Sequence, residues 1–347
     1  RRSLQRQLGP ELDPSRVATY PDAWGGYMDA GDWDRRSQHL TATWEHLELL
    51  DLFPDYFRQL SLALPPDEAN DNLPDLMNEA LWNLDHFRRL QRNHGGVGGG
   101  VESTAHPRPG EASWQESLRL GTFAPVPEKS LRYAACAARM AHLMSGYDPD
   151  RATIYSKSAV RAWDWANANA ERLIAKETQD PGSRRRDAVQ LQNSVRDMRA
   201  LAAVALYQLT GETEFHDAFQ ASTKLVGTGD AGHQMHATFA YAMLPDRLAD
   251  RNLQKKAVAW FEQAARDSLE FAQANAFNMA CRIPTLPLIA YVAYYSVPET
   301  SLGAILPRAH FLTGKKEYLQ GALAAAQFSA GANPMNMTFT TGVGQCY

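Results

Sequence analysis

Apolar residues recur every three or four positions along most of the chain, which is the spacing of amphipathic α-helices. The stretch 73–90 is typical, with Leu73, Met77, Leu81 and Leu84 on one face, Asn72 as a possible N-cap and Pro74 in the first turn. The same spacing predicts helices over residues 40–60, 73–90, 126–143, 152–174, 189–209, 214–225, 234–244, 253–274, 287–295, 302–312 and 317–328. No run of alternating apolar and polar residues predicts strands. The sequence therefore predicts an all-α fold.

Two of the predicted helix ends share one sequence. Leu-Thr-Gly occurs at 209–211 and again at 312–314, and each copy is followed at once by the start of another helix. Glycine at such a position ends a helix in the left-handed conformation. Helical hairpins are therefore expected. They could build a bundle, a solenoid or a barrel, but no fixed repeat period supports a solenoid. Recurrent Thr-Gly corners are typical of α/α barrels.

Composition narrows the functional classes. The chain has 347 residues, 44% of them apolar, and a net charge of −4. It therefore has enough apolar residues for a large core but no basic field for nucleic acid or anionic lipid. No apolar run is long enough to cross a bilayer. Cys136, Cys281 and Cys346 lie far apart and form no C-x-x-C pair, so they indicate neither structural zinc nor a disulfide framework.

The longest irregular stretch covers residues 93–123 and is rich in glycine and proline. Long loops of this kind often line a site, so Trp114 is expected either to contact a substrate or to pack under the loop. The glycines at 95–100 lack the Lys-Ser/Thr ending of a phosphate loop. Residues 179–187 are expected to form an exposed connection. Its three arginines form either a solvated turn or a small site for an acidic partner.

The candidate chemistry lies in GGYMDAGDW at residues 25–33, which carries Asp29 and Asp32 among glycines and aromatic residues. Glycine permits backbone angles that a Cβ forbids, so both carboxylates could face one water molecule. The aromatic side chains offer flat apolar faces and polar tips that suit a pyranose ring, and they are Trp24, Tyr27 and Trp33. Asp and Gly also mark plain surface turns. The residues alone leave both interpretations open.

Three stretches, in order along the chain, resemble family 9 glycoside hydrolases, the inverting cellulase family. GYMDAGD at 26–32 is similar to the family's Gly-Trp/Tyr-x-Asp-Ala-Gly-Asp loop. NLPDLMNEALW at 72–82 resembles its Asn-Gly-x-Pro-Asp-Leu-Leu-Asp-Glu helix start. Residues 329–344 resemble its late Gly-x-Asn-Pro-x-x-x-Ser-Tyr-Val-x-Gly-x-Gly loop.

The resemblance implies an (α/α)6 barrel of helical hairpins, in which residues 1–347 form a single catalytic domain. The predicted helices are one short of six complete hairpins, so the last hairpin is expected to be incomplete. It also implies inverting hydrolysis of β-1,4-glycosidic bonds in glucan. Asp32 would be the general base, and Asp29 would help to hold the attacking water. In the family the general acid is a later Glu, expected here beyond Tyr347 in a chain that is truncated at both ends.

A different account makes the chain complete, with a substitute acid among Glu102, Glu111 and Glu116. The chain also departs from the family after Asp32, where WDRR occupies 33–36, and at 338–340, where Thr-Phe-Thr replaces Ser-Tyr-Val. These changes leave the base in place. A polymer cleft and a closed exo-acting pocket both stay open.

The resemblance implies no organic cofactor, and it implies a secreted or periplasmic protein; the sequence does not indicate an oligomeric state. Asp148 and Asp150 are compatible with structural calcium, but their spacing is not that of an EF-hand and no metal site is predicted. His233 and His236 lack the Glu of a zinc-protease helix.

Two other functional classes remain open. A non-catalytic carbohydrate-binding or scaffold protein on the same barrel would keep the aromatic residues without an acid. An α/α-barrel polysaccharide lyase would use a Tyr/His base and release unsaturated products.

Overall fold

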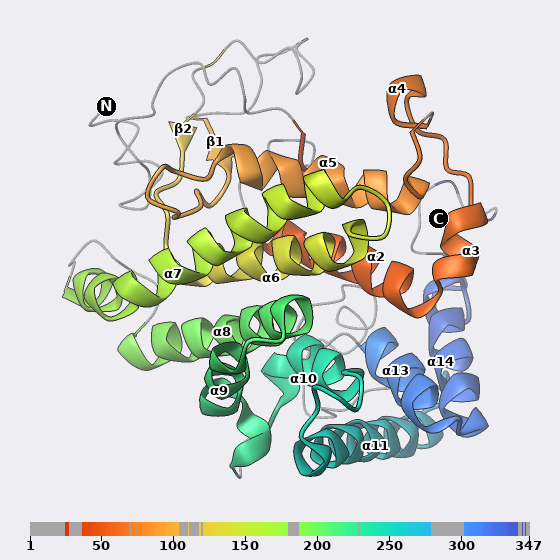
Figure 1. Ribbon diagram of the computed structural model, residues 1–347. Helices are drawn as coiled ribbons and strands as arrows, with labels where there is room; N and C mark the ends of the chain where they lie inside the picture. Colours follow the sequence, from red (N-terminus) through yellow and green to blue (C-terminus); the bar gives the residue numbers. More distant parts are fainter. Residues whose placement is uncertain are drawn as a thin grey trace. The chain divides into compact units, whose positions relative to one another are not determined.

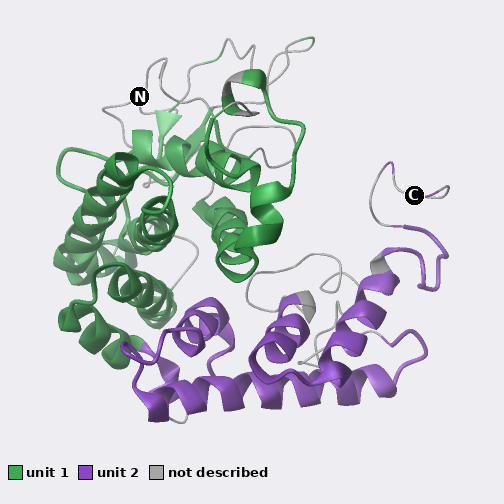
Figure 2. Cartoon of the chain, turned by 45° about the vertical axis from the view of Figure 1, so that its right-hand side comes forward, with its two compact units in different colours: residues 1–222 green, residues 223–347 purple. Residues whose placement is uncertain are grey.

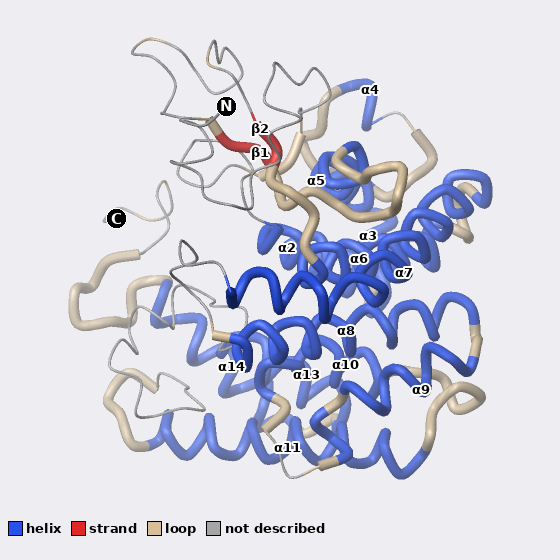
Figure 3. The backbone as a smooth tube through the Cα atoms, turned by 90° about the vertical axis from the view of Figure 1, so that its left-hand side faces the viewer, coloured by secondary structure: helices blue, strands red, loops and turns tan. Residues whose placement is uncertain are grey.

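The computed structural model describes residues 25–27, 37–69, 71–103, 110, 118, 121–179, 187–227, 230–278, 302–338, 342 and 344. Helices dominate these residues, which confirms the all-α prediction (Figures 1 and 3). The sequence pattern missed one small feature, an antiparallel pair of two-residue strands, β1 (Val101–Glu102) and β2 (Gly121–Thr122). The chain divides into two compact units, Arg1–Ser222 and Thr223–Tyr347 (Figure 2).

The first unit is built around α6 (Pro127–Met144), which packs against four helices: α2 (Leu40–Leu52), α5 (Asp75–Arg89), α7 (Pro149–Gln179) and α8 (Ala188–Thr210). A band of alanines, of which Ala134 and Ala138 are fully buried, lets these neighbours approach closely. The other elements of the unit are η2 (Ser37–His39), α3 (Pro54–Gln59), α4 (Pro66–Ala69) and α9 (Thr213–Ser222). The first unit therefore has a core of its own.

The second unit is formed by η4 (Lys224–Val226), η5 (Gly232–Gln234), α10 (Met235–Ala242), α11 (Arg251–Gln273), α13 (Leu302–Thr313) and α14 (Lys316–Ser329). Helix α11 packs against α10, α13 and α14. Gly321 of α14 faces Leu269 of α11 so closely that a Cβ at this position would overlap the leucine side chain. A larger residue at position 321 would therefore require the Leu269 side chain to move.

The two Thr-Gly corners have the geometry that the sequence predicts. Gly211 ends α8 at φ 73°, and Gly314 follows α13 at φ 72°, both in the left-handed region. The threonine before the glycine makes the same two hydrogen bonds in both corners. Thr210 and Thr313 each donate to the carbonyl four residues earlier and accept the amide two residues later. The hydroxyl thus closes the last helical turn and fixes the start of the connection.

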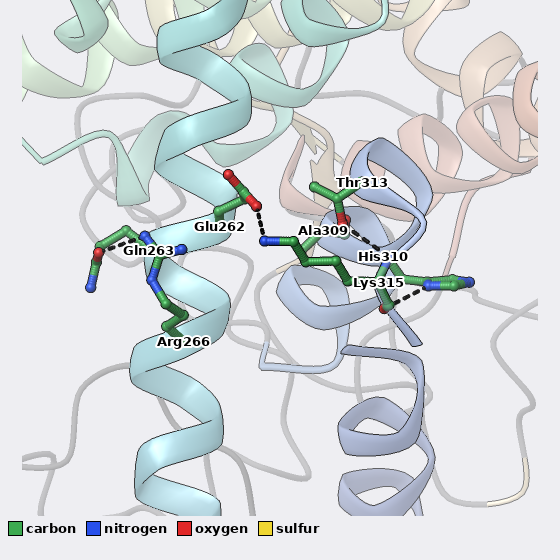
Figure 4. A network of polar contacts seen from close by, with 7 residues as sticks. All are labelled: Glu262, Gln263, Arg266, Ala309, His310, Thr313 and Lys315. Carbon is green, nitrogen blue, oxygen red and sulfur yellow. Dashed lines mark hydrogen bonds and ion pairs between the residues drawn. The ribbon is translucent and has the colours of Figure 1, made fainter. Parts of the chain in front are cut away.

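In the second corner, side chains also tie the connection to its surroundings (Figure 4). Nδ1 of His310 lies 2.9 Å from the Lys315 carbonyl oxygen. The Lys315 ammonium pairs with the Glu262 carboxylate on α11. This hydrogen bond raises the pKa of Lys315. Because Lys315 is exposed, the pair stabilises the corner only modestly.

Most helices begin and end within a few residues of the predicted positions, and two details differ. The predicted helix over 40–60 breaks at Phe53, because Pro54 begins a new helix, α3. The expected N-cap role of Asn72 is wrong, since Pro74 is the N-cap residue of α5. The predicted helix over 287–295 and the arginines at 184–186 lie outside the described residues.

Candidate active site

The segment Gly25 to Tyr27 lies against α5. The Gly26 amide donates to the Trp82 carbonyl over 3.3 Å, and Nε1 of Trp82 donates back to the Gly26 carbonyl over 3.0 Å. One helical turn earlier, the Glu79 carbonyl accepts a 3.0 Å hydrogen bond from the Tyr27 hydroxyl. Three hydrogen bonds therefore hold the chain on α5 immediately before the predicted carboxylate loop.

Glycines make this close contact possible, and their backbone angles are of the kind that the sequence analysis expects for them. Gly25 and Gly26 have φ values of 85° and 84°, which residues with a Cβ rarely adopt. A Cβ on Gly25 would also lie 2.9 Å from the Trp82 carbonyl oxygen and 2.9 Å from a guanidinium nitrogen of Arg89. Both the backbone conformation and the space thus exclude larger residues at position 25.

His46 of α2 lies beside the Tyr27 ring. The two rings meet edge to face, with centroids 6.3 Å apart and planes at 87°. Burial lowers the pKa of His46, and the nearby Glu79 carboxylate offsets only part of this effect. Since the ordinary value is near 6.5, the imidazole is neutral at pH 7. Tyr27 is therefore held by the Glu79 carbonyl, which accepts from its hydroxyl, and by the neutral His46 ring beside it.

Several residues of the 72–82 stretch form hydrogen bonds with the chain that precedes α5. Oδ1 of Asp71 accepts hydrogen bonds from the Leu73 amide at 2.9 Å and the Asn78 side chain at 3.0 Å. Oδ2 of Asp75 accepts the Leu62 amide at 2.7 Å. These acidic and amide side chains shape the start of α5.

Helix α5 is itself fixed to two other helices of the first unit. Asn83 donates to the Thr43 hydroxyl of α2 over 2.9 Å, within the core. On α7, the Tyr155 hydroxyl donates to the Asp85 carboxylate over 2.8 Å. Side chains locked by packing and hydrogen bonds provide a rigid support for a functional loop.

The late resembling stretch forms a turn after α14, in the second unit. Asn333 is buried, and its amide nitrogen donates to the carbonyls of Phe328 and Met337, each over 2.7 Å. Its Oδ1 accepts the Met335 amide over 3.0 Å. Asn333 thus connects the helix end to the returning chain, which accounts for the asparagine of the Asn-Pro pair.

Most predicted site residues lie outside the described residues. Only Tyr27 of the predicted set can be placed; the others are Trp24, Asp29, Asp32, Trp33 and Trp114. Of the candidate substitute acids, Glu111 and Glu116 also lie outside. Glu102 lies buried on β1, where Oε1 accepts the Ser103 amide at 3.3 Å. The catalytic and subsite roles therefore remain predictions.

Three residues that line the anchored segment were not assigned a role from the sequence: His46, Glu79 and Trp82. Glu79 and Trp82 belong to the 72–82 stretch and are three residues apart, about one helical turn. This spacing does not signal the contacts, because Glu79 contributes only a backbone carbonyl and the hydrogen-bonded residues are 52 and 56 positions apart. The described residues include no group of three or more His, Cys, Asp or Glu side chains that could hold a metal ion. No helix among them is both long and apolar enough to span a membrane.

Comparison with known proteins gives consistent matches. Endoglucanase C of Cellulomonas fimi is 25% identical, over 93% of this chain and 30% of that protein. A cellodextrinase of Butyrivibrio fibrisolvens is 23% identical, over 93% of this chain and 60% of that protein. The chain thus spans less than two thirds of the curated relatives it matches.

Solved structures agree in fold. The family 9 endoglucanase J30 superposes with a TM-score of 0.73 at 23% identity, covering 92% of this chain and 59% of that one. A Bacteroides ovatus GH9 structure gives a TM-score of 0.75 at 21% identity, covering 95% and 64%. Structures of this family are (α/α)6 barrels, which confirms the predicted fold class. The family model described as glycosyl hydrolase family 9 matches residues 7–347. The chain belongs to glycosyl hydrolase family 9.

Proposed function

We propose that the protein hydrolyses β-1,4-glycosidic bonds in glucan with inversion at the anomeric carbon. Family membership supports the reaction class, and relatives named endoglucanase, cellodextrinase and cellulose 1,4-beta-cellobiosidase support the substrate class. The structural observation that carries the proposal is the docking of Gly26 and Tyr27 on α5, directly before the two acidic residues of the loop. A loop held in this way suits the placement of a catalytic base.

In the proposed mechanism, Asp32 removes a proton from a water molecule while that water attacks the anomeric carbon. Asp29 accepts the second hydrogen bond of the same water and orients it. An acid on the opposite side of the bond protonates the leaving oxygen, with the two carboxyl groups about 6.5–9.5 Å apart. Trp24, Tyr27, Trp33 and Trp114 are proposed to contact the sugar rings.

The test compares Asp32→Asn with wild type in the whole protein that contains this chain, with cellotetraose as substrate. Asparagine keeps the size of the side chain but cannot accept the proton, so kcat should fall by a factor of about 10²–10⁴. Circular dichroism and calorimetric titration of cellotetraose should show an unchanged fold and similar binding. Wild-type turnover by the variant would contradict the role of Asp32.

The same assay separates the competing functions. A non-catalytic sugar-binding protein would bind cellotetraose but produce no new reducing ends in the wild-type form. A lyase would release products with an unsaturated ring that absorbs ultraviolet light, which hydrolysis products do not. The match to a hydrolase family favours hydrolysis over elimination.

We further propose that the protein acts outside the cytoplasm, in the medium or the periplasm. A polymeric glucan cannot cross a membrane, so its first cleavage occurs where the polymer is. Fractionation of the source cells, followed by immunodetection, tests this location; recovery in the cytoplasmic fraction alone would contradict it.

A further inference from the structure

The geometry points to Trp82 as a positioning residue for the loop that carries Asp29 and Asp32. This inference rests on the proposed function, because that function places those two carboxylates in the reaction. Trp82 itself is not proposed to touch the reacting atoms; it acts through the backbone of Gly26.

Trp82 makes two hydrogen bonds to one residue of the loop. Its carbonyl accepts the Gly26 amide at 3.3 Å, and its indole Nε1 donates to the Gly26 carbonyl at 3.0 Å. Two bonds from opposite sides of one residue restrict both its distance from α5 and its rotation. The Tyr27 hydroxyl bond to the Glu79 carbonyl adds a third point one turn away.

The indole N–H has a separable role in this contact. The carbonyl of residue 82 belongs to the helix backbone and would be present with any side chain. The side chain alone supplies the donor to the Gly26 carbonyl, and indole can only donate. Phenylalanine would keep an aromatic ring at this position and remove that donor. The Trp82 side chain is partly exposed, at 38%, so its replacement does not empty a buried cavity.

The anchor directly precedes the segment that carries the carboxylates. Asp29 follows Gly26 by three residues, and Asp32, the proposed base, follows it by six. A shift of the Gly26 peptide therefore displaces the start of that segment. Misplacement of a catalytic group by about 1 Å can lower the rate by a factor of about 10². Such a shift acts on the chemical step, and it also moves the adjoining Tyr27, a proposed sugar contact.

The experiment measures kcat and KM on cellotetraose for the whole protein with Trp82→Phe, with Trp163→Phe as the matched control. Trp163 of α7 is also partly buried, and it makes an edge-to-face contact with Phe215, with ring centroids 5.6 Å apart. Loss of one positioning hydrogen bond should lower kcat about tenfold. KM is expected to rise less than kcat falls, because Tyr27 adjoins Gly26 but keeps its own hydrogen bond to the Glu79 carbonyl. The control should keep wild-type kcat.

A second variant isolates the N–H group. The benzothiophene analogue of tryptophan, inserted at position 82, has nearly the same shape but a sulfur in place of the indole nitrogen. It should show the same fall in kcat as Trp82→Phe while keeping the wild-type melting temperature. This variant decides the question if Trp82→Phe folds poorly.

Three outcomes would overturn the inference. One is wild-type kcat in the folded benzothiophene variant. Another is a rise in KM with unchanged kcat, which would make Trp82 a substrate contact. A fall in kcat that Trp163→Phe reproduces would indicate general loosening of the fold. Absence of any β-glucan hydrolysis by the wild-type protein is a different result, since it overturns the proposed function and the inference together.

Discussion

Gly25 shows how strongly a single position is constrained in this protein. Its φ of 85° and the 2.9 Å approach of its missing Cβ to the Trp82 carbonyl oxygen both require glycine. The need for glycine here was predictable from the sequence, because two glycines precede paired carboxylates. The contact of this segment with Trp82 was not predictable, since the hydrogen bond that forms it joins Gly26 and Trp82, 56 positions apart.

Gly25→Ala should therefore impair activity more than stability. A left-handed backbone costs a residue with a Cβ about 1–2 kcal/mol, and the overlap with the α5 carbonyl forces the segment away from the helix. Turnover of cellotetraose should fall at least tenfold, about 1.4 kcal/mol in barrier height, while the melting temperature changes by a few degrees at most. Turnover equal to wild type would show that the segment tolerates displacement.

Tyr27 illustrates a limit of prediction from residue type. An aromatic ring with a polar tip suggested a sugar contact, but the tip is bonded to the Glu79 carbonyl and the ring edge meets His46. Its role as a sugar contact stays a prediction. The structure adds an anchoring role, which depends on a backbone carbonyl of α5 and a side chain of α2 and so could not be read from the loop itself.

At the scale of elements, the Thr-Gly corners were predicted correctly because their signal is local. A threonine bonded within its own helix and a glycine at positive φ need no partner from elsewhere in the chain.

The contact between α2 and α6, in contrast, depends on residues far apart in the chain. Arg139 of α6 is only 3% exposed, pairs with Asp51 at 3.0 Å and lies 4.5 Å from the Trp44 ring centroid. A buried arginine is compatible with the core only because those partners lie on the facing helix.

Gly314→Ala tests the corner in isolation. A Cβ at this position would meet no atom within 4 Å, so the cost comes from the φ of 72° alone. The free energy of unfolding should fall by about 1 kcal/mol. Gly227 is the matched control, because a Cβ there also meets nothing within 4 Å while φ is −113°. Denaturant titration should show Gly227→Ala close to wild type; equal effects of the two substitutions would contradict a conformational cause.

At the scale of the whole molecule, the chain consists of two compact units and belongs to one family over residues 7–347. The carboxylate loop belongs to the first unit and the Asn333 turn to the second. The prediction that 1–347 forms a single catalytic domain stays a prediction.

Product stereochemistry is a property of the complete catalytic site. If Asp32 activates water for a single direct displacement, a β-linked glucan must first release the α-anomer. Proton NMR of the anomeric signals during the first minutes of cellotetraose hydrolysis should show the α-anomer in excess before mutarotation. Initial formation of the β-anomer would instead indicate a covalent intermediate and a different role for the carboxylates.

The sequence by itself determined the helical class, the positions of most helices, the Thr-Gly corners and the family resemblance, because periodicity, capping and short motifs are encoded by neighbouring residues. The tertiary structure decided that Trp82, Glu79 and His46 hold the segment before the carboxylates, and that Arg139 is buried between helices. These contacts join residues far apart in the chain. Their energies depend on packing and burial, which a one-dimensional pattern does not specify.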